Sequence, residues 1–179
     1  MLHRLWVRKT RKNGAFEWDL AELAVPLTTS GMDWLHLHLA LNHVPVIGSL
    51  FVGLLLLTAM LRKSEELRRL SLWWLVGLML IGIPIKFTGD LAVDRAKEID
   101  GIEDARIEAH EQSADQATTG IFLAGIAASI ALFKARKGKP VPQWGMIAAL
   151  LLALVTFALM ARSANLGGKI RHPEIRKSD

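Results

Sequence analysis

Three histidines stand close together at the start of an apolar run. They are His36, His38 and His43, in the stretch LHLHLALNHVPVIG at residues 35–48. Imidazoles bind haem iron, copper and zinc, and they also carry protons. A polar side chain in apolar surroundings is costly unless it is ligated or hydrogen-bonded. The cluster therefore suggests a ligand-binding site.

Two further histidines follow later in the chain. His110 precedes an apolar run in RIEAHEQSADQATTG, and His172 follows another in ANLGGKIRHPEI. The chain has six histidines and no cysteine. Disulfides, iron–sulfur clusters, covalently attached c-type haem and thiolate copper sites are therefore excluded. A bound metal or haem would be held by histidine, carboxylate, methionine or backbone atoms.

Four apolar runs must position these histidines. The runs are Val44–Leu61, Leu70–Phe87, Thr118–Phe133 and Trp144–Ala161, interrupted by one charge, Lys86. Each run, with its flanks, is long enough to cross a hydrocarbon core as a helix. The 179 residues suit one domain. We predict an all-α integral membrane protein, a four-transmembrane-helix up-down bundle.

The loop charges predict the orientation. Residues 62–69 and 134–139 carry four basic residues each, whereas residues 90–115 carry nine acids and three bases. The positive-inside rule places the two basic loops in the cytoplasm and both termini outside. We expect a multi-pass protein of the bacterial inner (cytoplasmic) membrane, with the lipid bilayer as a partner. The net charge of +5 needs no nucleic acid to explain it.

The first thirty-one residues do not fit this orientation, because they carry five basic residues. They lack the apolar core of a signal peptide. Two interpretations stay open: Met32 is the true initiator, or the stretch is a genuine interfacial extension. The predicted domain boundaries are residues 1–31 for the extension, 32–175 for the membrane domain and 176–179 for a tail.

The orientation brings five histidines to the outer end of the bundle. If the third helix begins before His110, that residue lies on a stripe of small residues, a face that packs on neighbouring helices. The stripe is His110, Ala114, Ala117, Ile121, Ala124 and Ala128. His38 and His43 lie about 140° apart on an ideal helix, so they share a face only if Pro45 kinks it.

Other residues near the same end complete the expected site. Gly167 and Gly168 predict a positive-φ turn that folds His172 back over the site. Pro84 and Gly89 predict a kink and fraying at the end of the second helix. Lys86 and Arg162 either snorkel to the surface or face an anionic group such as a propionate. Glu111 and Asp115 are possible partners of the ligating histidines.

These motifs resemble the DUF2231 family of small four-helix bacterial membrane proteins. The resemblance rests on HLALNHVPVIG, TGD, IEAHEQSA and ANLGGKIRHPEI, and it covers about residues 34–175. It implies a site at His38, His43, His110 and His172, with no counterpart for His36. The family has no established activity that could be carried over, so the resemblance implies a fold and a site but no chemistry.

Three functions agree with this sequence. The first is a haem b site, with copper or zinc as the alternative, for electron transfer to a redox partner or within a larger membrane complex. His43 and His110 would be inner ligands, with His38 and His172 as an outer pair. The second is a structural or accessory subunit whose histidines are hydrogen-bonded. The third is a small transporter or quinone-reactive protein, and whether the protein is an enzyme stays open.

Overall fold

The computed structural model describes residues 9–12, 15–18, 34–99 and 101–172. The chain divides into two compact units, Met1–Asp33 and Trp34–Asp179. In the first unit, β1 (Lys9–Lys12) and β2 (Ala15–Trp18) pair as an antiparallel hairpin, with Lys9 opposite Trp18. Met32 and residues 176–179 lie outside the described residues. The start of translation at Met32 and the C-terminal tail therefore stay predictions.

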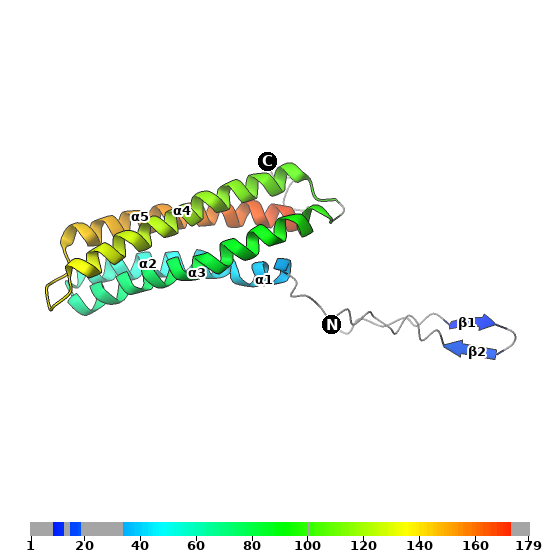
Figure 1. The fold of residues 1–179 in the computed structure, drawn as a ribbon, viewed down its shortest axis with the longest axis horizontal. Coiled ribbons are helices and arrows are strands. Elements are labelled where there is room, and N and C mark those ends of the chain that lie inside the picture. The colour runs from blue at the N-terminus through cyan, green and yellow to red at the C-terminus, as the bar shows by residue number, and fades with distance from the viewer. Residues whose placement is uncertain (1–8, 13–14, 19–33, 100, 173–179) are drawn as a thin grey trace. The chain divides into compact units, whose positions relative to one another are not determined.

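The second unit is a bundle of long helices, as predicted (Figure 1). Its elements are α1 (Trp34–Leu41), α2 (His43–Leu61), α3 (Glu65–Lys97), α4 (Asp104–Lys134) and α5 (Gln143–Arg171). The helix pairs α2–α3, α3–α4, α4–α5 and α2–α5 pack together, which closes the bundle, and α1 packs on α3. We call the end where α1 and α4 begin the histidine end, and the opposite end the basic end.

Four helical spans in this unit are long and apolar enough to cross a membrane. One of them is α1 and α2 taken together, Trp34–Leu61. The outward side chains of the four spans are large and apolar. Leu54, Trp73 and Leu151, for example, are each more than half exposed. A surface of this kind is unfavourable in water and suits lipid. The fold is therefore that of a multi-pass membrane protein.

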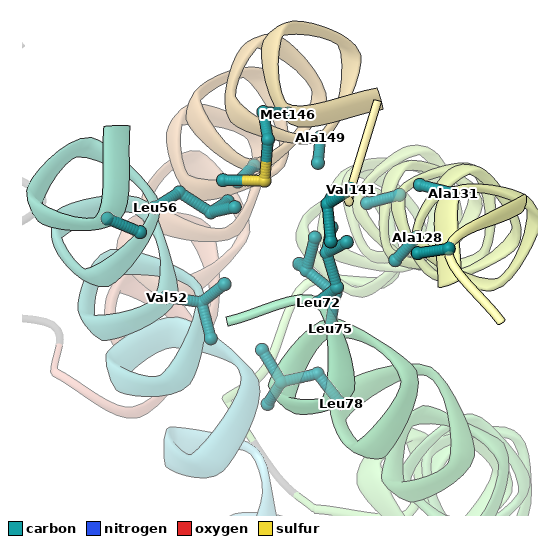
Figure 2. Close-up of a cluster of buried hydrophobic side chains, with 14 residues drawn as sticks. Val52, Leu56, Leu72, Leu75, Leu78, Ala128, Ala131, Val141, Met146 and Ala149 are labelled. Atoms are coloured by element: carbon teal, nitrogen blue, oxygen red, sulfur yellow. The ribbon is translucent and has the colours of Figure 1, made fainter. Parts of the chain in front are cut away.

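The core is built from small residues on α4 facing larger ones on the other helices. Figure 2 shows Val52 and Leu56 of α2 beside Leu72, Leu75 and Leu78 of α3, Ala128 and Ala131 of α4, and Met146 and Ala149 of α5. Ala117, Ile121, Ala124 and Ala128 of the predicted small-residue stripe are buried. α4 begins at Asp104, so His110 lies on this helix, as the prediction required.

Pro45 interrupts the first span. Proline lacks the N–H that would bond the carbonyl four residues earlier, at Leu41. The structure accordingly separates α1 from α2 at Asn42. Asn42 keeps helical backbone angles, and its N–H still donates to the carbonyl of His38 at 2.9 Å. The break therefore changes the chain locally and does not end the span.

The acidic loop predicted at 90–115 is wrong in extent. α3 continues to Lys97 and α4 begins at Asp104, so most of the stretch is helical. Pro84 lies inside α3, and the helix runs thirteen residues beyond it without the predicted fraying. The polar stretch continues the helices because ion pairs one turn apart support them. Arg95 pairs with Glu98 in this way, and Arg106 with Glu103.

The predicted turn at Gly167 and Gly168 is also wrong. α5 runs through both glycines to Arg171. Among the described glycines, Gly101 and Gly138 have positive φ. Gly167 is needed for a different reason, which is the close approach of an imidazole described below. As a result, His172 ends α5 and is not folded back over the bundle by these glycines.

Candidate functional site

His38 connects α1 to α3 through a backbone carbonyl. Its Nδ1 lies 3.3 Å from the carbonyl oxygen of Ile85, and the side chain is half-buried. The ring lies over Gly89, where an added Cβ would come within 3.0 Å of Cε1 of His38. Glycine therefore allows the imidazole to approach the α3 backbone closely enough to reach the carbonyl.

His110 makes the same arrangement between α4 and α5. Its Nδ1 lies 3.0 Å from the carbonyl oxygen of Ser163. The ring lies over Gly167, where a Cβ would come within 3.1 Å of Cε1 of His110. In both cases the glycine is four residues after the carbonyl, one helical turn further along. The two helix pairs thus hold an imidazole by the same backbone geometry.

This geometry determines which nitrogen of each ring is available. A carbonyl oxygen can only accept a hydrogen bond, so Nδ1 carries the proton. The neutral ring then has a lone pair at Nε2, which makes no hydrogen bond to any described residue in either His38 or His110. Two imidazoles from different helices are thus each anchored through Nδ1, and each has Nε2 available for a ligand.

The other predicted ligands lie outward. His43 is exposed, and its Nδ1 lies 3.2 Å from the carbonyl oxygen of Leu39 in the preceding turn. His172 is exposed, and its backbone N–H donates to the carbonyl of Gly168. His36 is exposed as well. The structure therefore brings His38 and His110 into the bundle, and it does not bring His43 or His172 to them.

The two predicted basic residues also differ in placement. Lys86 pairs with Asp90 on its own helix and with Asp115 on α4, at 2.9 Å. Arg162 is exposed. Lys86 thus links α3 to α4 near the histidines, and an anionic ligand would have to compete with two carboxylates for it. Asp115, which we expected to support a ligating histidine, pairs with Lys86 instead.

Small polar side chains lie next to the two imidazoles. Thr88, Ser113 and Ser163 are buried. Thr88 donates to the carbonyl of Ile85, which also receives His38. The hydroxyl of Ser113, one turn after His110, has no hydrogen-bond partner among the described residues. The Thr156 hydroxyl, which lies against Gly120, also has no partner among the described residues, so an unbonded hydroxyl is not specific to the histidine end.

The available ligands decide between metal types. No three histidine, aspartate or glutamate side chains of the described chain lie close enough to share a metal ion. Zinc and copper sites usually take three or more protein ligands. The haem macrocycle supplies four of the ligands of the iron, so one or two histidines complete the site. Two histidines are therefore enough to hold a haem but fewer than a copper or zinc site usually takes.

Sequence reasoning missed the residues that hold the imidazoles. The carbonyls of Ile85 and Ser163 have no signature in the sequence, since every residue has a carbonyl. Gly89 and Gly167 did stand out, but as breakers of helices. The sequence did contain one usable signal. Each inward histidine has a glycine at the same end of the neighbouring helix, Gly89 for His38 and Gly167 for His110.

The comparisons with known proteins provide no assignment. No family model matches the chain, and no curated protein or solved structure matches it. The resemblance to the DUF2231 family therefore stays a prediction.

Proposed function

We propose that this protein binds haem b between His38 and His110 and serves electron transfer in a bacterial cytoplasmic membrane. The observation that carries the proposal is the repeated arrangement in which Nδ1 is anchored to a backbone carbonyl and Nε2 is available. Histidines that ligate metals commonly donate their other N–H to such a carbonyl, which sets the tautomer and the ring orientation. Bound haem would supply one-electron redox chemistry.

The surroundings of the two rings agree with a large planar ligand. The neighbouring helix positions hold small residues: Gly89 and Ala92 on α3, Ser113 and Ala114 on α4, Ser163 and Gly167 on α5. Ile107, one turn before His110, is large and buried, so the helix ends would have to separate around it to admit a planar ligand. A redox partner or a larger membrane complex would exchange electrons with this site.

The alternative is that the histidines only hold the helices together. A His38–Ile85 or His110–Ser163 hydrogen bond joins two helices and is a sufficient structural role on its own. The loop charges favour the histidine end outside and the basic end in the cytoplasm, and both readings allow this orientation. A third possibility is a transporter or a quinone-reactive protein. No contact among the described residues favours it over the other two functions.

Substitution of His38 by asparagine separates the two readings. The asparagine amide occupies the place of Nδ1 and can still donate to the Ile85 carbonyl, but it has no counterpart of Nε2. The haem proposal predicts a folded His38→Asn protein without a Soret band, measured on protein purified from cells supplied with haem precursor. His110→Asn should behave in the same way.

Two controls complete this experiment. His43→Ala and His172→Ala should retain the haem of the parent protein, because both side chains are exposed. Thermal unfolding in detergent should show that His38→Asn is about as stable as the parent without haem. A parent protein that binds no haem, or haem retained in His38→Asn, would refute the proposal.

A further inference from the structure

The basic end carries a hollow lined almost entirely by cationic side chains. Its volume is about 270 Å³. The lining residues come from the end of α4 and the loop that follows it: Phe133, Lys134, Arg136, Lys137 and Lys139. The hollow lies at the opposite end of the bundle from His38 and His110, so its role is independent of the haem proposal.

The loop that forms this hollow is held in place by α3. Arg69 donates to the carbonyl oxygens of Ala135, at 3.0 Å, and Lys139, at 2.5 Å. Glu65 pairs with Arg69 and accepts the backbone N–H of Val141 at 2.7 Å. These bonds fix the loop backbone at both ends of the hollow. The cationic side chains are therefore presented by an ordered loop.

The positive charge in the hollow is not neutralised. None of its four basic side chains forms an ion pair with a described residue, and the one nearby acid in the network, Glu65, is engaged by Arg69. Arg136 lies over the ring of Phe133, with its guanidinium carbon 3.8 Å from the ring centroid. Four adjacent cations raise one another's energy, so an anion between them would be favourable.

The hollow lies where a membrane span meets water. Phe133 and Trp144 border the loop and are more than half exposed, as aromatic residues at a membrane interface are. The adjoining surface of α4 and α5 is apolar, with Ile130 and Ile147 exposed. A phospholipid whose phosphate is held in the hollow can therefore lay its acyl chains against this surface. A free anion has no such chains.

We propose that this hollow binds the headgroup of an anionic phospholipid, with the phosphate among Lys134, Arg136 and Lys137 and the acyl chains along α4 and α5. Basic side chains at a membrane surface each favour anionic lipid by a factor of about five. The fixed loop adds to this preference because the cations are already assembled before the lipid binds.

The test titrates the full-length protein in detergent with dioctanoyl phosphatidylglycerol and follows binding by the shift in thermal unfolding temperature. Dioctanoyl phosphatidylcholine and glycerol 3-phosphate are titrated in parallel. We expect phosphatidylglycerol to stabilise the parent protein more than either of them. The double variant Arg136→Gln/Lys137→Gln should bind about 25-fold more weakly. These two side chains make no hydrogen bond to α3, so the loop should stay in place.

The matched control is Arg95→Gln/Lys97→Gln, which removes two positive charges at the histidine end. Both residues are exposed, and this variant should keep the parent affinity. The proposal is overturned if phosphatidylcholine stabilises equally, or if the Arg136/Lys137 variant keeps its affinity. It is also overturned if glycerol 3-phosphate binds as well as the lipid, since that outcome indicates a site for a soluble anion.

Discussion

At the scale of single residues, the histidine end depends on contacts between a side chain and a backbone. His38 and His110 each approach a neighbouring helix where a glycine leaves room and a carbonyl accepts the imidazole N–H. The Ser163 carbonyl can accept the imidazole besides its bond within the helix, whereas the Ile85 carbonyl also accepts from the Thr88 hydroxyl, which goes with its longer contact to His38. The result is an oriented ring without a polar side-chain partner.

The effect of closing this space can be measured with two alanine substitutions in α3. Gly77→Ala adds a Cβ with no atom within 4 Å, so it should stabilise the helix by about 0.5–1 kcal/mol. Gly89→Ala should give no such gain. Its Cβ displaces the His38 ring and weakens a hydrogen bond that contributes about 1 kcal/mol. Denaturant unfolding in detergent micelles measures both.

Gly77→Ala is the control for Gly89→Ala, since both substitutions add one methyl group to α3. Gly89→Ala should also lower haem content if the haem proposal holds, while Gly77→Ala should not. Equal stabilisation by the two substitutions would contradict the contact between His38 and Gly89.

The sequence placed His38 and His110 at one end of the bundle but favoured His43 over His38 as the inner ligand. That choice used depth along the chain, because His43 is next to the apolar run. Depth does not determine which face a residue occupies, and five residues place His38 and His43 about 140° apart around a helix. The inward position of His38 follows from its contact with Gly89 on another helix, and sequence spacing does not report such contacts.

At the scale of helices, close approach depends on small residues at particular crossings. α4 and α5 meet at Ala131 and Gly145, where a Cβ on Gly145 would lie 2.6 Å from Cβ of Ala131. Gly53, on α2, is also buried, but a Cβ there would have 3.9 Å to the nearest atom, Cδ2 of Leu154. The two glycines therefore differ in the space beside them, not in burial.

Alanine at these two positions should have opposite effects. Gly145→Ala should destabilise the protein by about 1–3 kcal/mol, because a rigid Cβ and the helix backbone cannot move aside. Gly53→Ala should be neutral or stabilising, since its Cβ makes an ordinary contact. Thermal unfolding of both variants in the same detergent compares them. A stable Gly145→Ala protein would mean that α4 and α5 are farther apart than described.

Helix ends were the least predictable elements. Apolar runs mark only the part of a helix inside the hydrocarbon, so the sequence did not show that α3 and α4 extend beyond it through polar residues. Glycine pairs near a helix end usually indicate a turn, and Gly167 with Gly168 did not form one. Gly167 instead lies within α5 against the His110 ring, and local sequence cannot reveal such a contact between helices.

At the scale of the whole molecule, the four-helix bundle was predictable because lipid imposes strong constraints. Every backbone polar group inside the hydrocarbon must be satisfied within the chain, so long apolar runs become helices. Short loops then force neighbouring helices to run antiparallel. The charge asymmetry between the two ends predicts an orientation in the membrane, which the fold alone does not determine.

The predicted orientation can be tested at three positions, two at the basic end and one at the histidine end. Reporter fusions at Glu65 and Lys137 should show a cytoplasmic location, because the basic residues beside them resist transfer across the membrane. A fusion at Glu103, between α3 and α4, should show the opposite side. If Glu65 and Glu103 report the same side, α3 does not cross the membrane and the bundle is refuted. If all three fusions report reversed locations, the bundle stands, but the proposed haem site would face the cytoplasm.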